Sequence, residues 1–102
     1  MIEIQIKLNQ IAYDARSNVT STALRLNSIF TAMNSLSGIK STYLHNFSDN
    51  DIYFGQANSV TISTAGGVIK SGTSIEIPIE DRNSYPFFIS GPDSSIGIVV
   101  FA

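Results

Sequence analysis

The chain of 102 residues contains no cysteine, which excludes disulfide bonds and any metal site built on thiolates. It holds one histidine, His45, so a zinc site of the usual kind would need several carboxylates beside it. A serine nucleophile requires a base and an orienting acid, and the sequence has no Gly-x-Ser-x-Gly elbow. We therefore expect no enzyme activity, no metal and no cofactor.

Charged residues are also scarce. They make up 14% of the chain, against about 25% in an average soluble protein, and the net charge at pH 7 is −2. Nucleic-acid binding depends on clustered lysine and arginine that neutralise phosphates. The sequence therefore argues against a nucleic-acid partner.

Long apolar runs are missing as well. No stretch approaches the roughly 18 consecutive apolar residues that predict a membrane-spanning helix. The N-terminus alternates apolar and polar residues from Ile2 to Leu8, unlike the continuous apolar core of a signal peptide. We expect no membrane association.

Small polar residues and isoleucine take the place of charge. The chain has 30 serine, threonine and asparagine residues and 15 isoleucines. Isoleucine favours strands and cores, whereas serine, threonine and asparagine favour turns, loops and strand edges. This composition is typical of a β protein that covers part of its surface in an assembly.

The N-terminal third mixes three patterns. Alternation over residues 2–8 predicts a half-buried strand, whereas residues 9–21 show no clean period and are interpreted as irregular chain or an arm. Apolar residues at helical spacing predict a helix over residues 22–36, with Gly38 just past its end. We interpret this stripe first as packing onto the protein's own sheet and second as a subunit interface.

From residue 41 onward, short strands are separated by turn residues. The predicted strands cover 43–47, 52–54, 59–63, 68–69, 75–79, 87–89 and 96–101. Pro78 lacks a backbone donor, so its strand lies at a sheet edge or points that amide position outward. The last strand is apolar on both faces and should be central or sandwiched, for example against another subunit. The sequence predicts a mainly β fold, an antiparallel sandwich or barrel-like domain with one short helix. A single domain, 1–102, would comprise an N-terminal strand and arm (1–21), a helix and turn (22–40) and a β module (41–102).

The β module resembles a small module found in virion proteins of tailed bacteriophages. The resemblance lies in an Asn-x-Ser strand end at 46–48, Ile-Tyr-x-Gly at 52–55, Val-Thr at 60–61 and a glycine turn at 70–74. It continues through the aliphatic strand 75–79 with its acidic Glu80-Asp81 turn, the aromatic strand 85–91 and the aliphatic strand 98–100. It covers a little over half of the chain, and the first 40 residues take no part in it.

This resemblance implies a structural virion component, and within that class we favour a capsid decoration protein. The expected partners are other copies of the chain and the major capsid or other virion proteins. A head–tail connector, tail ring or fibre component is the alternative within the virion. The apolar and aromatic residues expected at subunit interfaces are Ile2, Ile4, Ile6, Ile29, Phe30, Met33, Tyr53, Phe87, Val99 and Phe101.

A second hypothesis is a small receptor- or glycan-binding module. It would place exposed aromatic rings beside acidic loops, with Tyr53, Tyr85, Asp49, Asp51 and Asp93 as candidates. The Asp-Asn-Asp turn at 49–51 offers hard oxygen ligands to calcium, although aspartate and asparagine also build such turns through their own hydrogen bonds.

Overall fold

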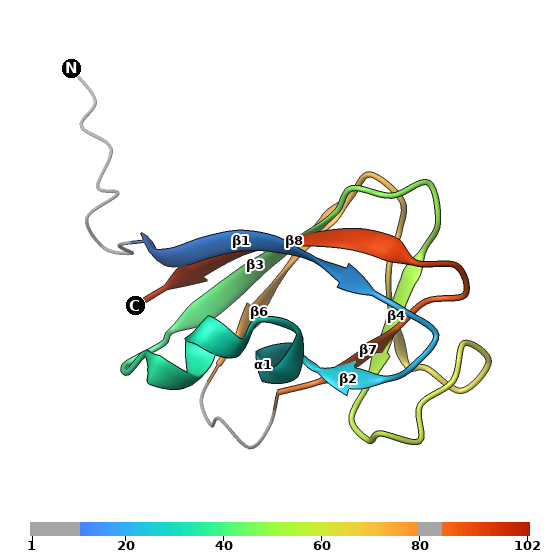
Figure 1. The fold of residues 1–102 in the computed structure, drawn as a ribbon, viewed down its shortest axis with the longest axis horizontal. Helices are drawn as coiled ribbons and strands as arrows, with labels where there is room; N and C mark the ends of the chain where they lie inside the picture. The colour runs from blue at the N-terminus through green and yellow to red at the C-terminus, as the bar shows by residue number, and fades with distance from the viewer. Residues whose placement is uncertain (1–10, 80–84) are drawn as a thin grey trace.

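The computed structural model describes residues 11–79 and 85–102, which form two antiparallel four-stranded sheets around a common core (Figure 1). Sheet A has the strand order β1-β8-β3-β6, and sheet B has the order β2-β7-β4-β5. In chain order the strands are β1 (Ile11–Val19), β2 (Leu24–Arg25), β3 (Ser41–Asn46), β4 (Ile52–Gly55), β5 (Gly67–Ile69), β6 (Ser74–Pro78), β7 (Phe87–Ile89) and β8 (Ser94–Phe101). The prediction of a mainly β, sandwich-like fold is confirmed.

The C-terminal strand β8 holds sheet A together. It pairs with β1 on one side and with β3 on the other, and its inward residues Ile96, Ile98 and Val100 are fully buried. The prediction of a central last strand is therefore confirmed. The prediction that Pro78 marks an edge is also confirmed, because β6 is the outermost strand beside β3.

The helix predicted over residues 22–36 is much shorter in the structure. One α-helical turn, α1 (Leu26–Ile29), is followed by a 3-10 segment, η2 (Thr31–Ser35), while Leu24–Arg25 pair with β7 as strand β2. The serine, threonine and asparagine residues between the apolar positions of this segment explain the difference, because small polar side chains compete for backbone hydrogen bonds. The Asn34 amide, for example, donates to the carbonyls of Asn27 and Thr31.

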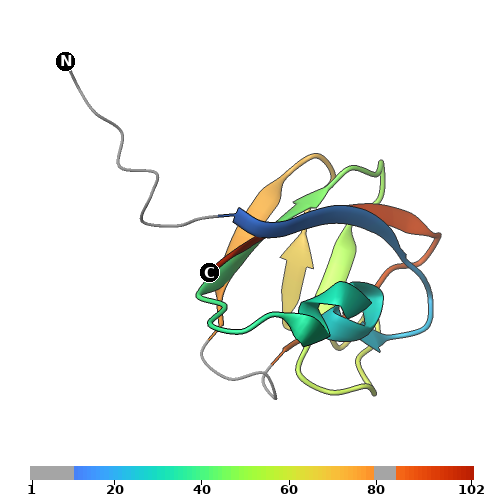
Figure 2. The same cartoon turned by 60° about the vertical axis from the view of Figure 1, so that its left-hand side comes forward.

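The apolar stripe nevertheless decides what this segment buries. Leu26, Phe30 and Met33 are at most 2% exposed and belong to the core cluster. Figure 2 shows the segment lying across one side of the sandwich, where α1 contacts both β1 and β2. Since β1 and β2 are the edge strands on that side, the helical turns close the sandwich there.

Two strand predictions were wrong. Residues 11–19 form strand β1 instead of irregular chain. Its inward residues include the small Ala15 and the polar Ser17, so the sequence shows no apolar residue at every second position. Residues 59–63, predicted as a strand, form turns, because the Thr61 and Thr64 side chains bond locally and the Ala65 amide donates to the Thr61 carbonyl. The strand predicted over residues 2–8 lies outside the described residues.

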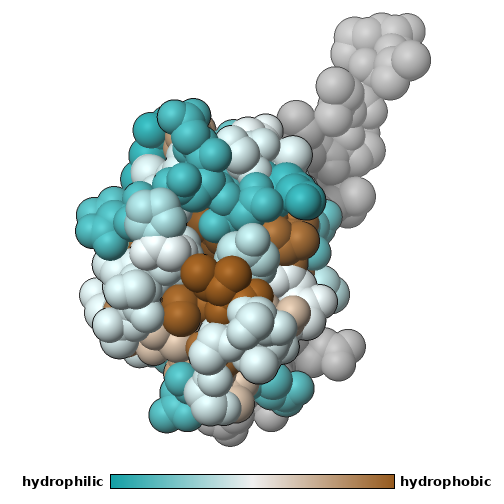
Figure 3. Space-filling view, turned by 90° about the vertical axis from the view of Figure 1, so that its right-hand side faces the viewer, coloured by the Kyte–Doolittle hydropathy of each residue, from teal (hydrophilic) through white to brown (hydrophobic). Residues whose placement is uncertain are grey.

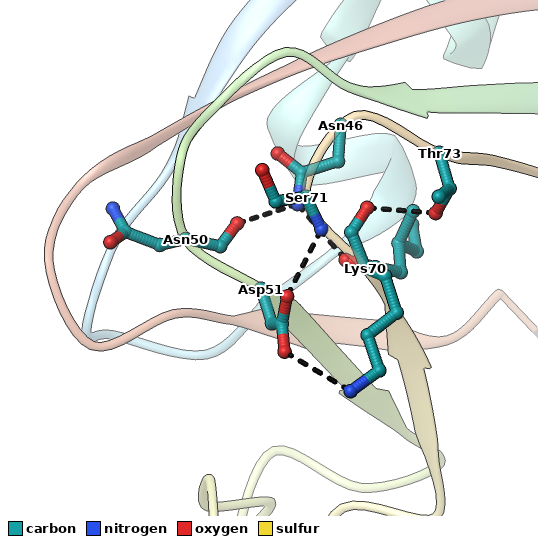
Figure 4. A network of polar contacts seen from close by, with 7 residues as sticks. Asn46, Asn50, Asp51, Lys70, Ser71 and Thr73 are labelled. Atoms are coloured by element: carbon teal, nitrogen blue, oxygen red, sulfur yellow. Dashed lines mark hydrogen bonds and ion pairs between the residues drawn. The ribbon is translucent and has the colours of Figure 1, made fainter.

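A buried asparagine joins the two sheets at one end of the sandwich (Figure 4). Asn46, which is fully buried at the end of β3, donates from Nδ2 to the carbonyls of Asn50 and Ile69 at 2.6 and 2.9 Å. Its Oδ1 accepts from the Ser48 amide at 2.9 Å. One side chain therefore fixes the β3–β4 turn and ties it to the end of β5.

The neighbouring β5–β6 turn is tied to the same place. Asp51 accepts a hydrogen bond from the Ser71 amide at 3.0 Å and forms an ion pair with Lys70 at 3.6 Å. The Ser71 hydroxyl donates to the Ser48 carbonyl at 2.6 Å. The turn itself requires Gly72, whose φ of 72° is in the left-handed region that favours glycine.

We expect Asn46→Ala to lower the free energy of unfolding by about 3 kcal/mol, because it leaves buried backbone groups without partners. Urea denaturation followed by circular dichroism measures this effect. The matched control is Asn50→Ala, since the bond recorded for Asn50 uses its backbone carbonyl and its side chain points away from the network in Figure 4. Equal stability losses in the two variants would contradict the role assigned to the Asn46 side chain.

Candidate interaction face

The face of sheet A that points away from the core carries exposed aromatic and charged side chains, and we call it the outer face. Because side chains alternate along strands, every second residue of β1, β8, β3 and β6 lies on it. The strand registers arrange these residues in rows that run across the sheet. Two adjacent rows form the centre of the face.

The first central row, the Arg16 row, reads Arg16, Gly97, His45 and Ser74 across the four strands. Arg16 is exposed on the edge strand β1, and His45 is half-buried on β3. His45 Nδ1 lies 2.5 Å from the Ser74 hydroxyl, so this pair links β3 to β6 above the sheet.

The second central row, the Asp14 row, reads Asp14, Val99, Tyr43 and Glu76. Asp14 and Glu76 are exposed at its two ends, and Tyr43 is 44% exposed. Each residue of this row lies two positions along the same strand from its counterpart in the Arg16 row. An acidic row therefore adjoins a basic one.

The Phe47 ring lies over the Arg16 row and contacts several of its residues. Its amide donates to the Ser95 carbonyl at 2.9 Å just beyond β3, and its ring covers Gly97, where an added Cβ would lie 2.5 Å from the ring. The Arg16 guanidinium lies 3.5 Å from the ring centroid, and the His45 ring meets it edge-on at 4.4 Å between centroids. Phe47 is nevertheless 45% exposed, so an aromatic surface remains available.

An open groove of about 620 Å³ lies over these two rows. Its lining includes Asp14 and Arg16 from β1, Tyr43 and His45 from β3, and Val99 from β8. Aromatic, arginine and aliphatic side chains held on rigid strands are the residue types enriched at protein interfaces.

Within the described residues, the His45–Ser74 contact lacks the third group of a catalytic triad. A serine nucleophile needs a histidine base that is oriented by a further group. Among the described residues, no ion pair joins His45 to a carboxylate, and no cluster of three histidine, aspartate or glutamate residues is placed to hold a metal. The pair instead acts as a cross-strand hydrogen bond.

The predicted interface residues are distributed over several parts of the fold. Val99 and Phe101 lie half-buried on the outer face, whereas Tyr53 and Phe87 lie half-buried in sheet B. Ile29 packs against the core. Ile2, Ile4 and Ile6 are outside the described residues.

Phe30 and Met33 must be corrected. They are 2% and 1% exposed and fill the core beneath the helical segment, so they offer no surface to a partner. The interpretation of the stripe as packing within the chain is the correct one for these two residues.

The sequence analysis missed Asp14, Arg16, Tyr43 and Phe47 as surface candidates. The signal for Tyr43 and Phe47 was present, because residues 43, 45 and 47 of an alternating strand share a face. The sequence carries no such signal for Asp14 and Arg16, because residues 11–19 show no apolar alternation that would predict a strand.

The residues considered for a calcium or glycan site differ in exposure and in bonding. Tyr85 is 2% exposed, so its ring is not available to stack on a sugar. Asp51 is engaged by the Ser71 amide and by Lys70, which gives its carboxylate a structural role in the turn. Asp49 and Asp93 are exposed and have no bond recorded to that network.

A second apolar surface lies at the end of the sandwich seen in Figure 3. The segment 56–66 folds back over sheet B, with Val60 against Gly55 and the Ile62 Cδ1 atom beside Gly91. Ile62 and Val68 are 44% and 37% exposed there. Figure 3 shows apolar atoms ringed by polar ones, an arrangement that recurs at contact sites.

Comparisons with known proteins found no match to this chain. No family model matches the chain, and no curated protein or solved structure is similar to it. In the described part of the chain, no helix is long and apolar enough to cross a membrane.

We expect Gly97→Ala to displace the Phe47 ring while changing the free energy of unfolding by less than about 1 kcal/mol, because the clashing atoms are at the free end of an exposed side chain. The ring-current shifts that Phe47 imposes on Arg16 and His45 would then be lost in NMR spectra. The control is Gly66→Ala, since a Cβ at Gly66 meets no atom within 4 Å. Unchanged Arg16 and His45 shifts in Gly97→Ala would show that Phe47 does not lie over Gly97.

Proposed function

We propose that the chain is a structural virion protein of a tailed bacteriophage, and specifically a capsid decoration protein that acts by protein–protein assembly. The observation that carries this proposal is the outer face of sheet A. Its centre combines exposed Tyr43 and Phe47 with Arg16, residue types that dominate the energetics of protein interfaces. The sequence resemblance of residues 44–101 to virion β modules supports the same class.

The second surface adds to this argument. Ile62 and Val68 lie over sheet B, whereas the outer face belongs to sheet A, so the two surfaces are on different sides of the molecule. A subunit that decorates a shell needs contacts both to the shell and to its neighbours. Many weak contacts of this kind add up to tight attachment when they are repeated over a symmetric particle.

Glycan binding is the runner-up, and the groove over the outer face favours it. Tyr43 and Phe47 present aromatic surface beside Asp14, Arg16 and Ser74, a combination suited to stacking and hydrogen bonding with a sugar. We rank this function second because the groove is open and its exposed rings are continuous with apolar Val99 and Phe101.

Quantitative peptide mass spectrometry on purified particles tests the proposed function. The number of copies of this chain is measured relative to the major shell protein of the same particles. We expect a ratio close to the number of symmetric sites on the shell, since decoration proteins occupy equivalent positions.

Roughly six to a few tens of copies would place the chain in a ring or tail instead of on the shell. Absence from particles would overturn the virion proposal. A glycan array with the same protein then tests the runner-up, with binding that Tyr43→Ala abolishes as the supporting result.

A further inference from the structure

We propose that two copies of the chain pack through their outer faces around a twofold axis that crosses the strands of sheet A between the Arg16 row and the Asp14 row. This inference deepens the proposed function and rests on it, because it names a second copy as one partner in the assembly. The argument uses the strand registers, which fix where each outer side chain lies.

The charges of the two rows are complementary under this symmetry. A twofold axis across the strands brings each strand of one copy over the same strand of the second copy. Each residue of one row then lies opposite the residue of the other row on that strand. Arg16 then faces Asp14 of the second copy, and the reverse contact occurs as well. Ser74 similarly faces Glu76, to which its hydroxyl can donate.

The alternative twofold axis, which runs along the strands, is disfavoured by the same charges. It would keep each row opposite itself and exchange β1 with β6. Asp14 of each copy would then face Glu76 of the other copy. Like charges held opposite each other are destabilising. The charge pattern therefore selects one arrangement of the two copies.

The uncharged positions also fit. The Phe47 ring covers Gly97 in the Arg16 row, so this ring would face Val99 of the second copy. Tyr43 would face His45 across the axis.

The charged groups at this face are available for such pairing. Asp14, Arg16 and Glu76 are exposed, and the ion pair recorded in the described part of the chain is the one between Lys70 and Asp51. The cation–π contact of Arg16 with Phe47 positions the guanidinium over the groove, and within residues 11–79 and 85–102 its N–H donors have no carboxylate partner.

The size of the face predicts a weak dimer. The four strands of sheet A hold 28 residues in all. With about 4.8 Å between strands and a rise of about 3.3 Å per residue, they give a footprint of roughly 450 Å² per copy. Stable complexes bury about 800 Å² per partner, so the dimer should be concentration-dependent.

Sedimentation equilibrium on the full chain, with single and double charge exchanges, tests this arrangement. Arg16→Asp alone or Asp14→Arg alone places like charges opposite each other at two points of the dimer. We expect each single variant to raise the dimer dissociation constant at least tenfold, and the double variant D14R/R16D to restore dimerisation. Asp93→Arg, an exposed reversal outside the outer face, is the matched control and should leave the dissociation constant unchanged.

Each outcome decides the inference. Rescue by the double variant supports it, because neither a folding defect nor the lost Arg16–Phe47 contact explains recovery by a second reversal. A wild-type chain that stays monomeric at millimolar concentration, or single variants that dimerise as well as wild type, overturns it. A monomeric chain that is still found on particles overturns the dimer alone, whereas a dimer that is absent from particles overturns the virion role alone.

Discussion

The double pairing of β8 is the constraint on which sheet A depends. This strand exchanges backbone hydrogen bonds with β1 and with β3 over most of its length, and both of its neighbours are far from it in the sequence. Its three buried aliphatic residues fix which side faces the core, because a shift by one residue would expose them. The same register then determines which side chains meet on the outer face.

The core and the outer face are therefore two consequences of one alternation. Inward residues of β3 and β8, such as Leu44 and Ile98, form the hydrophobic interior that stabilises the fold. Outward residues of the same strands, Tyr43 and Val99, lie in one row at the surface. Exposed Asp14, Arg16 and Glu76 lie in the same two central rows, so this face combines apolar and aromatic groups with charges of both signs.

Asn46 shows how a chain without disulfides fixes its loops. Its buried amide satisfies backbone groups of the β3–β4 turn and of β5, so the sheets are joined by directed polar bonds as well as by apolar packing. The Asp51–Lys70 pair and the Ser71 bonds hold the adjacent turn. Bonds among the chain's own residues thus tie both turns to the same end of the sandwich.

The sequence by itself left the stripe that includes Phe30 and Met33 open between core packing and a subunit interface. It determined the β class and predicted the central position of the last strand and an edge position for Pro78. Each of these follows from periodicity or from the chemistry of a single residue, which are local properties. Only the tertiary structure decided that residues 11–19 form a strand, because Ala15 and Ser17 become inward residues only when β8 lies beside them. The outer face had the same origin: Arg16, His45 and Ser74 are distant in sequence, and hydrogen-bonded register across three strand pairs is what places them in one row.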